Sequence, residues 1–164
     1  MHRTIYVETS IFSYLAGRPS RDLLVAARQQ LTHMWWQRRR AAFDLYVSQL
    51  VLDEVRAGDP EVARRRVALV ADLPLLDLTP EVAELAAALI ERLRLPPRSA
   101  ADAAHIAVAA YHGMDFLLTW NSAHIANAEL RRKVEQVCRE RGYSIPVLCT
   151  PDELMGEIDN GTDQ

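Results

Sequence analysis

Three acidic residues occupy positions where an apolar packing residue would be expected, and together they could hold a cation. Glu8 directly follows a short apolar run, and Glu54 falls inside the apolar arc of its predicted helix. Asp102 lies near the start of a helix that is rich in alanine and has no ordinary polar face. Burying an unpaired carboxylate costs several kcal/mol, so such groups need a compensating charge.

A divalent metal ion is the simplest compensation, because Lys133 is the only lysine in the chain and is remote in sequence from all three acids. Hard oxygen ligands with few or no histidine or cysteine ligands favour Mg²⁺ or Mn²⁺. Metal sites of this kind typically act on phosphate esters. The acids therefore indicate a hydrolytic phosphate site.

Glu8 and Asp102 also have a purely structural interpretation. Glu8 would complement the positive end of a helix that Ser10 or Thr9 caps. Asp102 follows Ser99 by three positions, which is the spacing of a capping box. Neither acid decides between the two interpretations by itself.

His105 follows Asp102 by about one helical turn and shares the only polar stripe of that helix. We expect a hydrogen-bonded histidine in the core, or behind the metal ligands, rather than a ligand. Thr119 and Asn121 follow another apolar run, and Asn121 could equally cap the next helix.

Short apolar runs alternate with helical patterns along the chain. Strands are predicted for residues 4–8, 43–48, 73–78, 115–120 and 145–150. Helices are predicted to begin at Ser10 and to span residues 22–40, 49–58, 79–95, 99–113 and 122–142, with another starting at Asp59-Pro60 and a capped turn at 150–157. This order predicts a parallel sheet covered on both faces, with ligands bound outside the carboxyl ends of its strands. We expect one domain over residues 1–157 and a disordered tail over 158–164.

The composition, charge and motifs of the sequence argue against several classes of protein. The 164 residues carry a net charge of −3, and the pI is 5.9, which argues against a protein that coats nucleic acid electrostatically. No apolar run is long enough to cross a bilayer. Cys138 and Cys149 lack ligand-like spacing, so we expect reduced core thiols and a cytoplasmic location. The first strand is followed by no glycine-rich turn, and no Walker motif is present.

The ordered set of motifs resembles the PIN-domain family, and in particular VapC-type ribonuclease toxins of type II bacterial toxin–antitoxin pairs. The likeness is carried by the spacing of Glu8 and Ser10, by Glu54 within SQLVLDEV, by Asp102 within SAADAAHIAVAA, and by FLLTWN. It spans residues 5 to about 157. Each motif is weak alone, but their order and spacing together are fairly specific.

This resemblance implies a PIN-like three-layer α/β/α sandwich with a central, mainly parallel sheet. It also implies a Mg²⁺- or Mn²⁺-dependent endoribonuclease in which activated water attacks phosphorus in line and leaves 3′-hydroxyl and 5′-phosphate ends. The partners it implies are an RNA substrate, an antitoxin that blocks the cleft, and a second copy in a homodimer.

Carried onto this chain, the family pattern makes Glu8, Glu54 and Asp102 the metal-binding and catalytic acids. Ser10 would orient one acid or the substrate, and Thr119 is given the same substrate-binding or orienting role. Asn121, the fourth catalytic position, stands where many PIN domains have a further acid.

Two positions depart from the family pattern. Glu8 replaces the usual aspartate and is one methylene longer, and Asn121 supplies no charge. Three carboxylates predict one well-occupied metal ion in the free protein. The same departures leave open a different class of function, in which a catalytically silent PIN-like module binds RNA or a partner protein.

Overall fold

A computed structural model of the chain describes residues 1–121 and 128–156. Its strands form one parallel sheet in the order β3-β2-β1-β4-β5. The strands are β1 (Arg3–Val7), β2 (Phe43–Ser48), β3 (Leu75–Leu76), β4 (Phe116–Leu118) and β5 (Val147–Cys149). The α-helices are α1 (Thr9–Ala16), α2 (Leu23–Arg38), α3 (Gln49–Val55), α4 (Pro60–Val70), α5 (Pro80–Leu93), α6 (Ala100–Tyr111) and α7 (Ala128–Glu140). Short 3₁₀ turns are η1 (Arg40–Ala42), η2 (Pro97–Ser99) and η4 (Pro151–Leu154).

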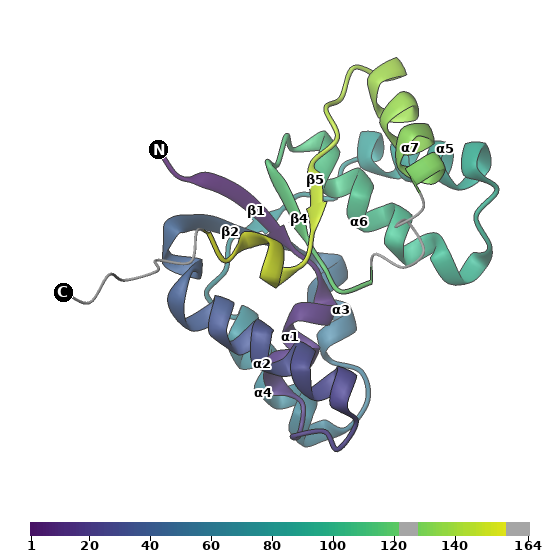
Figure 1. Ribbon diagram of the computed structural model, residues 1–164. Helices are drawn as coiled ribbons and strands as arrows, with labels where there is room; N and C mark the ends of the chain where they lie inside the picture. The colour runs from purple at the N-terminus through teal and green to yellow at the C-terminus, as the bar shows by residue number, and fades with distance from the viewer. Residues whose placement is uncertain (122–127, 157–164) are drawn as a thin grey trace.

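The helices form two groups on either side of the sheet, as Figure 1 shows. Helices α1 to α4 pack on one another below the sheet in this view, and α5, α6 and α7 form the second group at the upper right. The three-layer α/β/α sandwich with a parallel sheet, predicted from the sequence, is confirmed. The central strand β1 is thus buried between the two helix layers, whereas the edge strands stay partly exposed, with Leu75 at 50% and Val147 at 58%.

Local sequence signals place most helix starts where the sequence predicts them. Asp22, Asp59 and Thr79 each accept a hydrogen bond from a backbone N–H in the first turn of α2, α4 and α5. These bonds satisfy donors that a helix start leaves unpaired. Two predicted caps differ from the structure. The Ser99 side chain makes no cap hydrogen bond to α6, so one of the two hydrogen bonds of a capping box is absent. The N-cap of α1 is Glu8, whose side chain accepts from the backbone N–H of Ser10, so Ser10 is not the cap that the sequence predicts.

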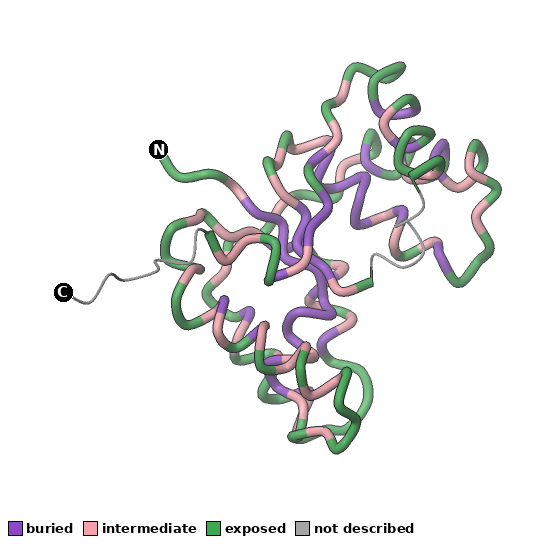
Figure 2. Tube along the Cα trace, viewed as in Figure 1, coloured by how far each residue is buried: buried purple, intermediate pink, exposed green. Residues whose placement is uncertain are grey.

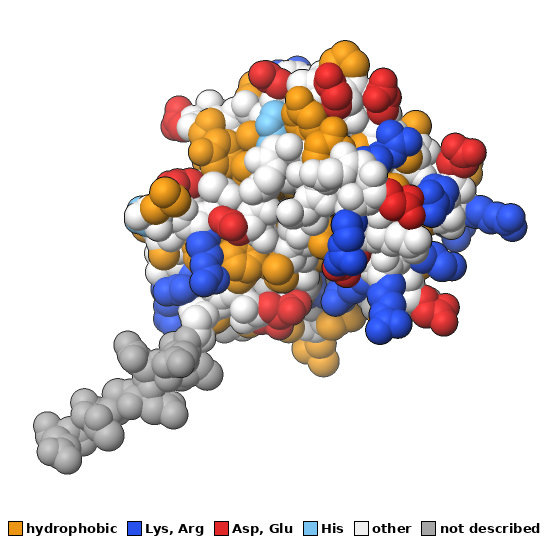
Figure 3. Space-filling view, turned by 90° about the horizontal axis from the view of Figure 1, so that it is seen from above, with side chains coloured by type: hydrophobic (Ala, Val, Ile, Leu, Met, Phe, Trp, Pro, Cys, Tyr) orange, Lys and Arg blue, Asp and Glu red, His pale blue; other side chains and the backbone are white. Residues whose placement is uncertain are grey.

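The core centres on β1, whose last three residues are fully buried. Figure 2 shows the buried trace running through the middle of the molecule, along the central strands and into α1 and α6. Helix α6 is buried from His105 to Ala110, as its lack of a polar face predicted. Outside this core, acidic and basic side chains are interspersed on the face drawn in Figure 3, with no field of one sign.

The sheet order puts the end of β1 next to the end of β4. Val7 pairs with Leu118, so the residues that follow the two strands leave the sheet side by side. The chain builds outward from β1 to β2 and β3, then returns to the other side of β1 for β4 and β5. A ligand site in a parallel sheet is expected at such a reversal of strand order.

Some predicted boundaries differ from the structure. The third strand shrinks from six predicted residues to Leu75–Leu76, because only Val47 and Ser48 of β2 offer it partners. The predicted helix over 122–142 is described from Ala128 onward, and its first part lies outside the described residues, as does the predicted tail over 158–164. In the described ranges, no helix is both long and apolar enough to span a bilayer.

The two cysteines are free and buried, as the sequence predicts. Burial raises the pKa of Cys138 to about 11, and burial together with the nearby acids Glu153 and Asp152 raises the pKa of Cys149 to about 12. Both thiols are therefore protonated at neutral pH and poor nucleophiles. We expect no reaction of the native protein with a thiol-specific disulfide reagent at pH 8 over minutes, and two equivalents after denaturation. Rapid native modification would contradict this packing.

Candidate functional site

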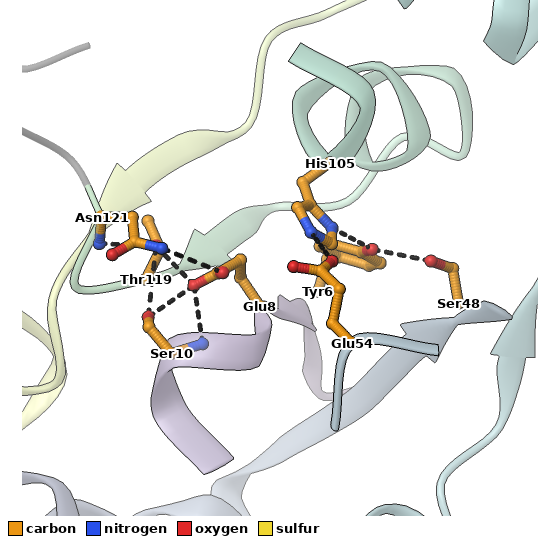
Figure 4. Close-up of polar contacts among 8 residues, drawn as sticks. All are labelled: Tyr6, Glu8, Ser10, Ser48, Glu54, His105, Thr119 and Asn121. Atoms are coloured by element: carbon orange, nitrogen blue, oxygen red, sulfur yellow. Dashed lines mark hydrogen bonds and ion pairs between the residues drawn. The ribbon is translucent and has the colours of Figure 1, made fainter. Parts of the chain in front are cut away.

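The candidate site lies where β1, β4, α3 and α6 meet, outside the carboxyl ends of the two central strands (Figure 4). Glu8 comes from the β1–α1 junction, because a strand that ends at Val7 presents the next residue at the sheet edge. Glu54 comes from helix α3, and His105 comes from the middle of helix α6. Three segments distant in sequence thus converge at one place.

Glu8 is buried, with 4% of its surface exposed, and is held by hydrogen bonds on both carboxylate oxygens. Its Oε2 accepts from the backbone N–H of Ser10 at 3.0 Å, from the Ser10 hydroxyl at 2.5 Å and from the Thr119 hydroxyl at 2.8 Å. Its Oε1 accepts from the Asn121 side-chain amide at 3.3 Å. These bonds replace the hydration that burial removes, and they leave Oε1 with the greater capacity for another ligand.

The segment that follows β4 is tied to the start of α1. The backbone N–H of Trp120 donates to the Ser10 hydroxyl at 2.9 Å, and the backbone N–H of Asn121 donates to the Thr119 hydroxyl at 2.9 Å. Ser10 and Thr119 therefore each use one hydroxyl to bind Glu8 and to receive a backbone donor. This double role fixes the Glu8 carboxylate relative to both strands.

A second chain of hydrogen bonds runs from Glu54 into the core. Glu54 Oε1 lies 2.6 Å from His105 Nε2, the Nδ1 of the same ring lies 2.7 Å from the Tyr6 hydroxyl, and that hydroxyl lies 2.8 Å from the hydroxyl of Ser48. His105 is 2% exposed, whereas the Glu54 side chain is 38% exposed. The buried hydrogen bonds of Tyr6 and His105 thus hold in place the partly exposed carboxylate of Glu54.

Tyr6 supplies one proton to this chain. Burial is the main cause that raises its pKa, and the carboxylates of Glu54 and Glu8 raise it further, so the phenol stays protonated. If it donates to His105 Nδ1, the proton of the neutral ring is on Nε2 and points to Glu54. These hydrogen bonds orient the Glu54 carboxylate through the His105 ring.

The residues present fit a divalent cation. One ligand atom each from Glu8, Glu54 and His105 lies within 4.8 Å of the other two. Two carboxylate oxygens and an imidazole nitrogen form a donor set suited to Mn²⁺ or Mg²⁺, with carboxylates as the harder ligands. His105 can offer Nε2 to a metal only when its ring proton is on Nδ1, facing the Tyr6 hydroxyl. With the proton on Nε2, His105 instead hydrogen-bonds Glu54, which is the role behind the ligands that the sequence predicts for it.

Asp102 lies at the edge of this group. It is half-buried on the first turn of α6 and lines one small pocket together with Glu8, His105, Thr119 and Asn121. The tight three-atom group contains His105 in its place, one helical turn further along α6. The structure thus brings every sequence-predicted residue of the site to one region, with Asp102 on its wall.

Sequence reasoning missed Tyr6 and Ser48. A tyrosine in a fully buried strand is a usable signal, because its hydroxyl needs a partner. Ser48 is the last residue of β2, just as Glu8 follows the last residue of β1. The partner of the Ser48 hydroxyl depends on the register of β1 and β2, which the sequence does not show. His112, at the C-terminal end of α6, lies away from the site, and its Nε2 is 2.8 Å from the backbone oxygen of Asp77.

The substitution Tyr6→Phe tests the buried hydrogen bonds that the Tyr6 hydroxyl makes. The substitution keeps the ring in the core but removes the partner of both Ser48 and His105, so we expect a loss of about 1–3 kcal/mol in the free energy of unfolding. Denaturant titration measures it. Tyr46→Phe is the matched control, since Tyr46 pairs with Tyr6 across the sheet and is expected to change stability by less than ~0.5 kcal/mol. Equal effects would show that the Tyr6 hydroxyl is not part of a buried chain.

Comparison with known proteins places this geometry in context. A family model described as PIN domain matches residues 5–130. No curated protein matches the chain as a relative. Among solved structures, the chain is similar to one described as VapBC2 from Rickettsia felis bound to a DNA fragment from their promoter, with a TM-score of 0.58 and 12% identity over 90% of this chain and 98% of that chain. A structure of VapBC-5 from Mycobacterium tuberculosis has a TM-score of 0.47 and 19% identity over 76% of this chain and 92% of that chain.

Proposed function

Because this chain belongs to the PIN-domain family, we propose that it is a metal-dependent endoribonuclease that hydrolyses RNA phosphodiester bonds. The observation that carries the proposal is the convergence of Glu8, Glu54 and His105 on one point, with Asp102 on the wall of the same pocket. A structural role alone does not require two acids and a histidine from three separate segments to meet, with a third acid in the same pocket.

In this proposal Glu8, Glu54 and Asp102 hold Mg²⁺ or Mn²⁺, with His105 beside them. The bound ion would supply an activated water and would offset negative charge on the phosphate. Ser10 and Thr119 keep Glu8 in the orientation that their hydrogen bonds impose.

Asn121 supports the site without adding charge. Its side-chain amide N–H donates to Glu8 Oε1 at 3.3 Å. The three carboxylates then carry a charge of −3, which we expect to retain one ion firmly; a second ion would need the phosphate of the substrate.

We further propose that the protein is the toxin of a toxin–antitoxin pair, acts in the cytoplasm and forms a homodimer. A structure with a similar fold is described as VapBC2 bound to a DNA fragment from their promoter, and that likeness supports a VapC-type toxin with an antitoxin partner. The protonated, buried state of Cys138 and Cys149 is compatible with a reducing compartment.

RNA cleavage tests the enzymatic proposal. We expect purified protein to cut a structured RNA in the presence of Mn²⁺ or Mg²⁺, to lose this activity with a chelator, and to leave 5′-phosphate ends. Asp102→Asn removes one charge from the pocket at nearly constant shape and is expected to be much slower. Identical results for both proteins at high Mn²⁺ would show that any cleavage does not depend on this pocket, and would favour a catalytically silent module that binds RNA or a partner protein.

A second candidate function is an inactive module that binds RNA or a partner protein. The observation that favours it is the saturation of Glu8 Oε2 by three donors, together with the neutral Asn121 in place of an acid. RNA binding without cleavage, unchanged in Asp102→Asn, would support this alternative.

A further inference from the structure

An aromatic and basic cluster adjoins the candidate site on the side of α1 and α2. The Arg28 guanidinium carbon lies 5.3 Å from the centre of the Trp120 ring, and Arg28 Nη1 lies 3.4 Å from the hydroxyl of Tyr14. The Tyr14 and Trp120 rings meet edge to face at 5.8 Å. All three side chains are half-buried, so the guanidinium is held and still reaches solvent.

Trp120 cannot turn freely, because both its backbone and its ring are bonded. Its indole N–H donates to the hydroxyl of Thr32 at 2.8 Å, and Thr32 is fully buried. Its backbone N–H donates to Ser10, the residue whose hydroxyl also bonds Glu8. The ring is thus a fixed platform that sets the position of Arg28.

The cluster is directly connected to the acidic centre. Trp120 stands between Thr119 and Asn121, and the side chains of both neighbours bond Glu8. On α1, Tyr14 follows Ser10 by four residues, a rise of roughly 6 Å along the same helix face. Tyr14, whose hydroxyl contacts Arg28 of α2, therefore begins about one helical turn along α1 from Ser10.

Arg28 has no salt bridge to a carboxylate within residues 1–121 and 128–156. Its contacts are with an aromatic face and a phenol, which orient a guanidinium but do not neutralise it. An acidic centre repels a polyanion, so a strand that enters this site needs a cation nearby. A fixed, unneutralised arginine beside the acids meets that need.

We propose that Arg28, positioned by Trp120 and Tyr14, is a substrate subsite that binds a backbone phosphate of the RNA next to the one that is cleaved. This inference rests on the proposed function, since it names how the same site holds its substrate. A phosphate is favoured over a stacked base because Arg28 covers one face of the Trp120 ring and Tyr14 meets the ring edge-on. The guanidinium fork can bind phosphate oxygens in pairs.

Binding without cleavage is the first test. We measure the affinity of a short single-stranded RNA by fluorescence anisotropy in EDTA, over a series of salt concentrations. Arg28→Gln is expected to weaken binding roughly tenfold and to reduce the slope of log affinity against log salt by about one. Arg38→Gln is the matched control, because it removes the same charge from an exposed position on the same helix and is expected to do neither.

Cleavage kinetics provide the second test. Arg28→Gln is expected to raise KM with a smaller effect on kcat, and Arg28→Lys to recover part of the loss, because it restores charge without the planar fork. Thermal unfolding checks that the variants are folded.

The outcomes separate the two proposals. If Arg28→Gln binds RNA like Arg38→Gln, the subsite is overturned, the nuclease proposal stands and the cluster serves packing or a protein partner. If binding depends on Arg28 but the wild type never cleaves, the subsite stands and the nuclease proposal fails. A wild-type chain that binds no RNA overturns the subsite.

Discussion

Glu8→Gln is expected to lower metal-dependent RNA cleavage by at least about 100-fold, because even the hydrogen-bonding partners of metal ligands typically cost 10- to 100-fold when they are replaced. The amide is neutral and can present only one acceptor oxygen to the donors that now surround the carboxylate. Initial rates with a labelled RNA at saturating Mn²⁺ measure the effect.

The fold should survive this substitution. The amide oxygen of glutamine can take the place of Oε2 and accept from Ser10 and Thr119, while its NH₂ group faces Asn121. The Asn121 amide can rotate and present its oxygen instead of its nitrogen, so no buried donor faces another. Cleavage by Glu8→Gln at the wild-type rate, with unchanged thermal unfolding, would remove Glu8 from the catalytic set.

His105→Phe is expected to weaken Mn²⁺ binding by about 10- to 100-fold, whether His105 binds the ion directly or holds Glu54 in place. Phenylalanine has a similar shape, so the core stays filled, but it removes the contacts to Glu54 and to Tyr6. Isothermal titration with Mn²⁺ measures the affinity independently of any activity.

A matched variant separates a metal role from a packing role. Tyr6→Phe keeps the His105 ring and its contact with Glu54, and it is expected to reduce Mn²⁺ affinity less than His105→Phe does. Unchanged Mn²⁺ affinity in a folded His105→Phe protein would show that His105 neither binds the ion nor holds one of its ligands in place.

The order of elements was predictable because each carries local signals. β2 occupies the predicted residues 43–48, and Asp59 and Thr79 cap the helices that they were expected to begin. The predicted length of β3 was too great, because a short apolar run does not indicate how many backbone partners the neighbouring strand offers. Ser99 was misread for a related reason: the spacing of a cap does not guarantee its hydrogen bond.

The site was partly predictable. Glu8 and Glu54 were identified because an acid in an apolar setting is costly and therefore informative. Tyr6 and Ser48 were not, because a tyrosine in a buried strand is usually taken as packing and its hydroxyl partner comes from another strand. His105 was assigned behind the ligands, since helical spacing gives its face but not its distance from α3. The roles of all these residues stay predictions until they are measured.

The most direct test of the central claim is a calorimetric titration of the metal-free protein with Mn²⁺, with no nucleic acid present. The account predicts one ion per chain, with binding strongly weakened in Glu8→Gln and in Glu54→Gln. It predicts wild-type binding in Asp53→Asn, which removes the neighbouring exposed acid that bonds Gln49 instead of the site. The account would be contradicted if the wild type bound no Mn²⁺ or bound two ions tightly. It would also be contradicted if Asp53→Asn weakened Mn²⁺ binding as much as Glu8→Gln and Glu54→Gln do.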